Sequence, residues 1–146
     1  MKKILLIILS LSTLFIITGC TNNRIGEKTP YDIKTDQVTI KVKEDSLTSS
    51  QATFIIKNKT DKEFTYGEPY HLEIKHNDSW HILELEPNND LFFTMPAYSL
   101  KAGESVEKEC EWEHGYGQLK KGTYRIVKDV SNKKEQLSVA AEFTIK

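Results

Sequence analysis

The sequence contains little cysteine and little arginine, and neither sign of charge dominates it. Two cysteines occur in 146 residues, which allows at most one disulfide within the chain. Arginine occurs only twice, against 18 lysines, so few planar guanidinium groups are available to read phosphates. The formal net charge of −1 also lacks the basic excess of nucleic-acid-binding domains. We therefore expect no nucleic-acid partner.

Long apolar runs are also absent, except for one at the N-terminus. Residues 1–20 begin with two lysines near the start, continue as an apolar stretch over residues 4–17, and end in Gly19-Cys20. A charged start, an apolar middle and small residues at the end are the layout of a secretory signal peptide. The apolar stretch of about 14 residues is too short for a bilayer span, which needs roughly 20.

The end of this segment, Ile17-Thr18-Gly19-Cys20, resembles the lipobox of bacterial lipoproteins. The resemblance implies a lipoprotein signal peptide over residues 1–19, cleavage before Cys20, and a diacylglycerol group on the Cys20 sulfur. Each buried methylene contributes about 0.8 kcal/mol, and two acyl chains are enough for stable anchoring. The implied location is the extracytoplasmic face of the cell membrane, and the implied partner is the membrane itself.

The mature chain would carry 18 basic and 21 acidic residues, a formal charge of −3. Residues 20–35 show no sustained periodicity and contain glycine, proline and asparagine, so we expect a lipidated N-terminus followed by a flexible tether. If Cys20 carries lipid, Cys110 is a single thiol. Its alternation with Val106 and Trp112 favours a buried core cysteine over a reactive one.

From residue 36 onward the sequence has the period-two alternation of half-buried strands. Val38, Ile40 and Val42 alternate with polar residues, and the last ten residues alternate over five apolar positions. Turn signals recur every 8 to 15 residues, and no amphipathic helix follows the signal peptide. This rhythm predicts an all-β domain of seven to eight antiparallel strands, a β-sandwich over residues 36–146. A closed barrel is the structural alternative.

Two turns resemble those of immunoglobulin-like domains. Residues 119–124 follow L-x-x-G-x-Y, which resembles the corner leading into strand F. In that corner the tyrosine hydroxyl bonds to the backbone a few residues upstream, so the resemblance makes Tyr124 the structural corner. Residues 100–105, Leu-Lys-Ala-Gly-Glu-Ser, look like the turn before strand E of bacterial immunoglobulin-like modules.

Together with residues 66–73, Trp80 and residues 122–128, these turns resemble a bacterial Ig-like domain family found in exported lipoproteins of Gram-positive bacteria. The resemblance implies an immunoglobulin-like fold and a surface location, and it supplies no catalytic residues. The paired cysteines of antibody domains are missing. Stability must therefore come from packing, to which we expect Trp80 and Trp112 to contribute as core residues.

No catalytic, cofactor or metal site is predicted. The four histidines, His71, His76, His81 and His114, fall on outward strand positions, at a turn and in a loop, and not in a ligand pattern. Cys110 and His114 stand four residues apart, about 13 Å along a strand, which is too far for a thiol–imidazole pair without a sharp bend. No G-x-S-x-G motif occurs.

Tyr116, between two glycines in a loop, is the candidate contact residue. The alternative is a tyrosine folded back over the sheet edge. Without a catalytic set, the most economical interpretation is a membrane-anchored binding or accessory module whose ligand is a protein or a cell-wall polymer. The alternative is an inhibitor of a secreted or membrane enzyme. An enzyme is the third and least supported hypothesis.

Overall fold

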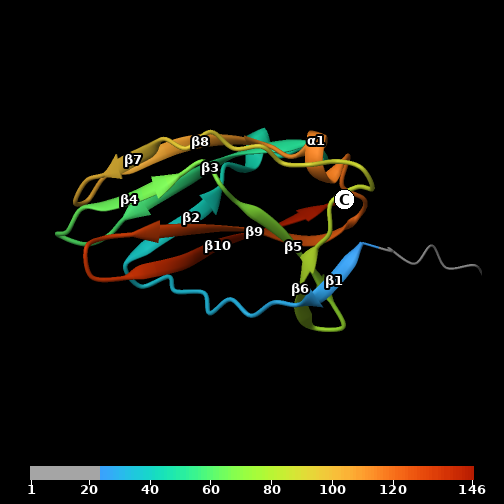
Figure 1. Ribbon diagram of the computed structural model, residues 1–146, viewed down its shortest axis with the longest axis horizontal. Helices are drawn as coiled ribbons and strands as arrows, with labels where there is room; N and C mark the ends of the chain where they lie inside the picture. Colours follow the sequence, from blue (N-terminus) through green and yellow to red (C-terminus); the bar gives the residue numbers. More distant parts are fainter. Residues whose placement is uncertain (1–23) are drawn as a thin grey trace, which may run out of the picture.

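The computed structural model describes residues 24–146, so the predicted signal peptide and Cys20 lie outside this range. The described chain forms two antiparallel β-sheets stacked against each other and elongated along one axis (Figure 1). The prediction of an all-β antiparallel sandwich is confirmed. Among the described residues, no helix has the length and apolar character needed to cross a bilayer.

Ten strands are present in residues 24–146, with one 3-10 turn, η1 (Glu44–Ser46), and one single-turn helix, α1 (Glu113–Tyr116). The strands are β1 (Ile25–Lys28), β2 (Val38–Val42), β3 (Gln51–Asn58), β4 (Phe64–Gly67), β5 (His71–His76), β6 (Ser79–Leu83), β7 (Ala97–Leu100), β8 (Ser105–Glu111), β9 (Gly122–Ser131) and β10 (Gln136–Ile145). The count exceeds the predicted seven to eight, because β1 forms in the predicted tether and β4 and β5 are separate strands.

The larger sheet is built around β9. Its strand order is β1-β6-β5-β9-β4-β7, and β10 pairs with β9 along ten residues of register. The opposite edge of β9 is shared, because Tyr66 of β4 pairs with Val130 and His71 of β5 pairs with Val127. The smaller sheet has the order β2-β3-β8. The chain between β4 and β5 therefore leaves the sheet edge for a few residues.

An aromatic cluster joins the two sheets. Phe54 of β3, Trp112 after β8, and Phe143 of β10 meet with ring centroids 5.4 to 6.4 Å apart. Tyr124 of β9 also stacks on Phe143, with the ring centroids 5.9 Å apart. Trp112, Phe54 and Tyr124 are at most 1% exposed. Each aromatic pair of this kind contributes roughly 0.5–1.5 kcal/mol beyond the burial of its area.

Tyr124 also fixes the chain before β9. Its hydroxyl donates a hydrogen bond to the carbonyl oxygen of Lys120, four residues upstream, at 2.8 Å. Leu119 is buried beside it, and the Leu119 amide donates to the Ser49 carbonyl at 2.8 Å. The hydrogen bond between the Tyr124 hydroxyl and the Lys120 carbonyl is the one that the L-x-x-G-x-Y resemblance implies.

The prediction of a flexible tether over residues 20–35 is wrong for the part that the structure describes. β1 pairs with β6 and places Ile25 opposite Leu83. The chain beyond it passes over β5, where Thr29 contacts Glu73 and Tyr31 contacts His71. Ile33 then bridges Ser138, and the Lys34 amide donates to the Ser138 carbonyl at 2.9 Å. The four residues of β1 are enough to pair with the edge strand β6, but a strand this short shows no period-two alternation in the sequence. Residues 20–23 lie outside the described range.

A buried ion pair lies beneath this N-terminal segment. The fully buried Glu73 accepts hydrogen bonds from Arg125 Nε at 2.6 Å and from the Thr29 hydroxyl at 2.6 Å, and His71 Nε2 lies 3.1 Å away. Burial alone would raise the pKa of Glu73. The hydrogen bonds from His71, Thr29 and Arg125 outweigh that effect and hold the pKa below its ordinary value.

Two sequence-based assignments change in this part of the fold. Trp112 is a core residue as expected, but Trp80 is only half-buried and lies on the outer face, with the Arg125 guanidinium 4.6 Å from its ring. The apolar residues of the stretch 91–98 also favour an edge strand that contains Pro96, but most of this stretch is loop. β7 begins only at Ala97, after Pro96.

We predict that Tyr124→Phe lowers the free energy of unfolding by about 0.5–2 kcal/mol, because one buried hydrogen bond is lost. Denaturant melts of residues 24–146 measure the effect. The matched control is Tyr31→Phe, which should leave the midpoint unchanged because Tyr31 is 39% exposed. Equal midpoints for wild type and Tyr124→Phe would show that this hydrogen bond does not stabilise the corner.

We predict that Glu73→Gln destabilises the domain by about 3–5 kcal/mol at neutral pH, because the buried Arg125 loses its counter-ion. The pKa of Glu73 is lowered on folding, so its contribution is present above the unfolded value of about 4.5 and is lost as pH falls. The difference between wild type and variant should therefore shrink between pH 7 and pH 3. Glu142→Gln, an exposed change opposite Arg125, is the control. A difference that does not depend on pH would contradict this assignment.

Candidate binding surface

The loop between β6 and β7, residues 84–96, carries two of the three exposed large hydrophobic residues in the described part of the chain. Phe92 and Met95 are each 90% exposed, and the only other exposed large hydrophobic residue among those described, Tyr31, is 39% exposed and packs on His71. A loop of 13 residues without regular structure is uncommon in a compact domain and is usually functional. We define residues 84–96 as the apolar loop.

The base of the apolar loop is held firmly. Leu85 and Leu91 pack at Gly115 of α1, where an added Cβ would lie 2.5 Å from the Leu91 side chain. The Glu86 amide donates to the Gly115 carbonyl at 2.9 Å. Further along, the Phe93 ring meets Tyr70 edge-on at 5.2 Å. Alternate apolar residues thus anchor the loop, and Phe92 and Met95 are left in solvent.

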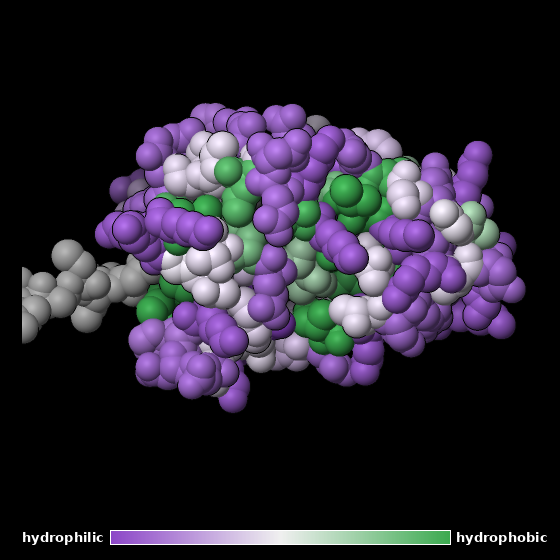
Figure 2. All heavy atoms as spheres, turned by 180° about the vertical axis from the view of Figure 1, so that it is seen from behind, coloured by the Kyte–Doolittle hydropathy of each residue, from purple (hydrophilic) through white to green (hydrophobic). Residues whose placement is uncertain are grey.

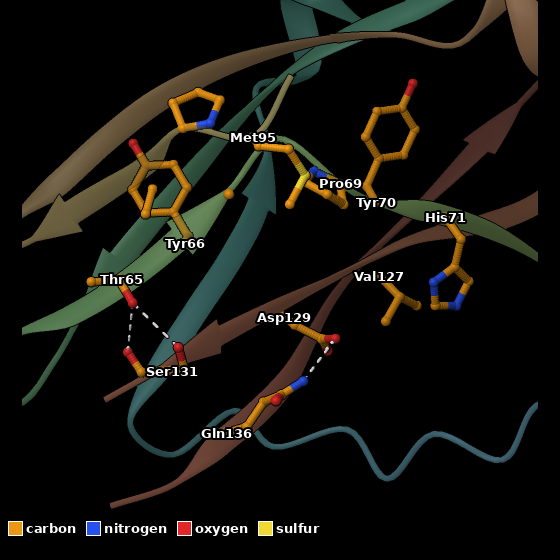
Figure 3. Close-up of a pocket in the computed structure, with 13 residues that line it drawn as sticks. Thr65, Tyr66, Pro69, Tyr70, His71, Met95, Val127, Asp129, Ser131 and Gln136 are labelled. Carbon is orange, nitrogen blue, oxygen red and sulfur yellow. Dashed lines mark hydrogen bonds between the residues drawn. The ribbon is translucent and has the colours of Figure 1, made fainter. Parts of the chain in front are cut away.

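One groove opens beside Met95 on the outer face of the larger sheet, where β4 and β5 diverge along β9 (Figure 3). Its volume is about 450 Å³. Figure 3 shows Met95 beside Pro69 on one side of this space and the Asp129–Gln136 hydrogen bond, 3.1 Å long, on the other. The groove therefore has an apolar rim and a polar side.

A second groove lies on the flank of the sandwich, between the start of β5, the end of β8 and residues 88–93. Tyr70 borders both grooves, and its hydroxyl donates to the Glu111 carbonyl at 2.7 Å. Burial raises the pKa of Tyr70, so this hydroxyl stays a neutral donor. The carboxylates of Glu68, Asp90, Glu109 and Glu111 also line this groove.

Lys128 holds the chain that separates the two grooves. Its side chain is buried on β9, and its Nζ donates to the carbonyls of Gly67, Glu68 and Pro69 at 3.0 to 3.1 Å. Gly67 is the last residue of β4, and Glu68 and Pro69 lie between β4 and β5, where the chain does not pair with β9. The Lys128 ammonium therefore supplies hydrogen-bond donors to carbonyls beyond the pairing of β4 with β9. Burial lowers the pKa of the Lys128 ammonium, although the group has three acceptors.

The prediction that Tyr116 is a contact residue is wrong. The side chain is 3% exposed, and its hydroxyl accepts a hydrogen bond from the Leu72 amide at 3.1 Å. The single turn of α1 directs the ring inward, and Gly117, with φ of 64°, lets the chain turn away afterwards. The flanking glycines allow this turn and the close contact with Leu91; they do not create an exposed loop.

The structure also shows the surroundings of Cys110 and of two of the histidines. Cys110 is 6% exposed and is a free thiol, as its alternation predicts, and burial raises its pKa to about 11. The rings of His76 and His81 lie 5.8 Å apart, and His81 Nδ1 contacts the Gly26 carbonyl. Among residues 24–146, no group of three or more His, Cys, Asp or Glu side chains could hold a metal ion. Cys20 lies outside the described residues.

Sequence reasoning missed Phe92 and Met95. The stretch Leu91-Phe92-Phe93-Thr94-Met95-Pro96 contains four apolar residues without strict alternation, and a proline ends it. A broken period next to proline is a signal against a half-buried strand, and it could have marked these residues as a loop.

The antiparallel sandwich and its tyrosine corner define an immunoglobulin-like β-sandwich protein. The family model described as "Bacterial Ig-like domain" matches residues 34–144, and the chain belongs to this family. A search of curated proteins finds no match. Domains of this family are typically non-catalytic, and the family membership indicates a surface-binding or accessory module.

We predict that Cys110 remains reduced and reacts slowly with a thiol reagent in the folded domain. At pH 8 the thiol is almost fully protonated because its pKa is raised to about 11, and its burial blocks access. Labelling of residues 24–146, which lack Cys20, should be slow before unfolding and rapid after it. Gln118→Cys supplies an exposed thiol as the positive control. Equally fast labelling of Cys110 and the Gln118→Cys thiol would contradict this prediction.

Proposed function

We propose that the chain is a membrane-anchored extracytoplasmic lipoprotein whose immunoglobulin-like domain is a binding module. The Ile17-Thr18-Gly19-Cys20 sequence supports the anchor, and membership of the bacterial Ig-like family supports the binding role. The observation that carries the binding proposal is the exposure of Phe92 and Met95, each 90%, on a loop whose base is fixed. Exposed apolar side chains between two grooves are the anchors that a protein interface needs.

The geometry of the apolar loop favours contact with a protein. The rim contributed by Met95, Pro69 and Pro96 is apolar, and polar groups border it on either side. An apolar centre with a polar rim is the usual arrangement of protein interfaces. Figure 2 shows the domain from behind the view of Figure 1, and on this face hydrophobic patches lie among hydrophilic side chains.

The anchor is tested by Cys20→Ser in cells that express the full chain. We expect the wild type in the membrane fraction in processed form, and the variant unprocessed or released, because serine has no thiol for the thioether bond. Fractionation followed by mass measurement of the N-terminal peptide reads both location and lipid. A variant that is processed and membrane-bound like the wild type would refute the anchor.

The binding role is tested by placing a photo-reactive phenylalanine analogue at position 92 in the full chain in intact cells, with the same analogue at the exposed Lys133 position as the control. We expect one dominant adduct from position 92, none from 133, and a several-fold lower yield when Met95→Ser is added. Because Met95 is exposed, its replacement should change stability by less than about 0.5 kcal/mol. Equal adducts from both positions, or none, would refute the role of the loop.

The same experiment separates the inhibitor hypothesis from the accessory-module hypothesis. An adduct with a secreted or membrane protease, combined with lower protease activity, would support inhibition. An adduct with a protein that has no hydrolytic activity would support an accessory module. Both outcomes keep the apolar loop as the contact surface.

A further inference from the structure

The first described residue, Arg24, is held at one end of the sandwich. Its guanidinium donates to the Tyr116 carbonyl at 2.6 Å and lies 3.3 Å from the Glu86 carboxylate. Its carbonyl oxygen accepts a hydrogen bond from the Glu84 amide at 2.8 Å. The Arg24 side chain is only 12% exposed. Both the backbone and the side chain of Arg24 are therefore fixed to the domain.

The chain after Arg24 is also attached to the domain. β1 continues on the edge of β6, and Gly26 approaches β6 so closely that an added Cβ would lie 2.9 Å from the Ile82 carbonyl. Thr29 is hydrogen-bonded to the buried Glu73, and Ile33 bridges Ser138. Five successive attachments between Arg24 and Lys34 exclude a swinging segment in this part of the chain.

The covalent distance from Cys20 to Arg24 is short. Four residue steps separate them, so their Cα atoms lie within about 14 Å of each other even in a fully extended chain. The headgroup layer of one leaflet takes up roughly 5–8 Å. A compact domain of about 120 residues has a radius of gyration of about 14 Å, which equals the longest possible connection. A lipid on Cys20 would therefore leave the domain too little chain to tumble freely.

Figure 1 shows which end of the domain this connection reaches. The described chain begins at the end that carries α1 and the C-terminus, and the β9–β10 hairpin and the turn between β7 and β8 lie at the opposite end. We propose that the α1 end faces the lipid headgroups and that the β9–β10 hairpin points away from the membrane. This orientation rests on the lipid anchor proposed above.

Three exposed polar residues follow α1 at this end, Gln118, Lys120 and Lys121. Polar and basic side chains there can lie against headgroups without desolvating an apolar surface. The apolar loop begins at the same end, at Glu84 next to Arg24, and then runs along the flank. The orientation thus leaves the flank open to a partner and directs the lysine-bearing hairpin, residues 131–136, outward.

The test uses the full lipidated chain, purified from membranes and reconstituted into phosphatidylcholine vesicles that contain a lipid with a nitroxide headgroup. A fluorophore is attached at Gln118→Cys beside α1 or, in a separate protein, at Lys133→Cys in the hairpin; the native Cys110 is buried. We expect quenching at position 118 to be several-fold stronger than at position 133.

A matched variant carries about 20 Gly and Ser residues between Asn23 and Arg24, a linker with a typical span of about 25 Å. It keeps the lipid and the folded domain but removes the short connection, so the difference between the two positions should vanish. Equal quenching at both positions in the parent protein would overturn the proposed orientation. An undiminished difference with the linker would overturn the short connection between Cys20 and Arg24 as its cause.

Mass measurement of the N-terminal peptide separates the two levels of the proposal. Lipid on Cys20 together with equal quenching would refute only the orientation and leave the anchored binding module intact. A purified chain without lipid on Cys20 would refute the anchor, and the orientation with it.

Discussion

The rest of this structure depends on the way β9 shares one of its edges. β10 covers one edge along ten residues of register, and β4 and β5 divide the other. Backbone carbonyls between β4 and β5 lose their ladder partners at this division, and an unpaired buried carbonyl is costly. Lys128 supplies donors to the carbonyls of Glu68 and Pro69 in this segment and to the carbonyl of Gly67, the last residue of β4. The division therefore becomes a stable feature, and both grooves form along it.

A second buried charge fixes the other side of the larger sheet. Glu73 is fully buried and gathers Arg125, Thr29 and His71 around it. Because Thr29 belongs to the N-terminal segment, the carboxylate attaches this segment to the domain. The fold thus uses polar interactions where the chain enters and where the sheet divides, and it uses the aromatic cluster around Trp112 between the sheets. Each polar group in these places has a partner, and no buried side-chain N or O atom of the described residues lacks one.

The binding proposal rests on exposed side chains that this rigid framework holds in place. The apolar loop is anchored by Leu85, Leu91 and Phe93, and its exposed large apolar side chains are Phe92 and Met95. Preorganised side chains lose less conformational entropy on binding than side chains on a mobile loop, which suits a recognition surface. The attachment of Arg24 to the domain carries the proposed orientation at the membrane. A firmly held entry point makes the anchor a constraint on orientation as well as on location.

The sequence by itself determined the class of fold and its central landmarks. Period-two alternation predicted the sandwich because side chains on a strand point alternately to the two faces, and this local rule also placed Trp112 and Cys110 in the core. The L-x-x-G-x-Y spacing identified the Tyr124 turn because its hydrogen bond spans only four residues.

Only the tertiary structure decided the features that join distant segments. Residues 25–28 became a strand because the edge of β6 was available to pair with them, and Tyr116 turned inward because the Leu72 amide lay within reach of its hydroxyl. Trp80 lies on the outer face and not in the core, because β6 pairs with β5 in a register that places the tryptophan ring over Arg125. In each case the deciding partner stands tens of residues away in the chain, so no local pattern could record it.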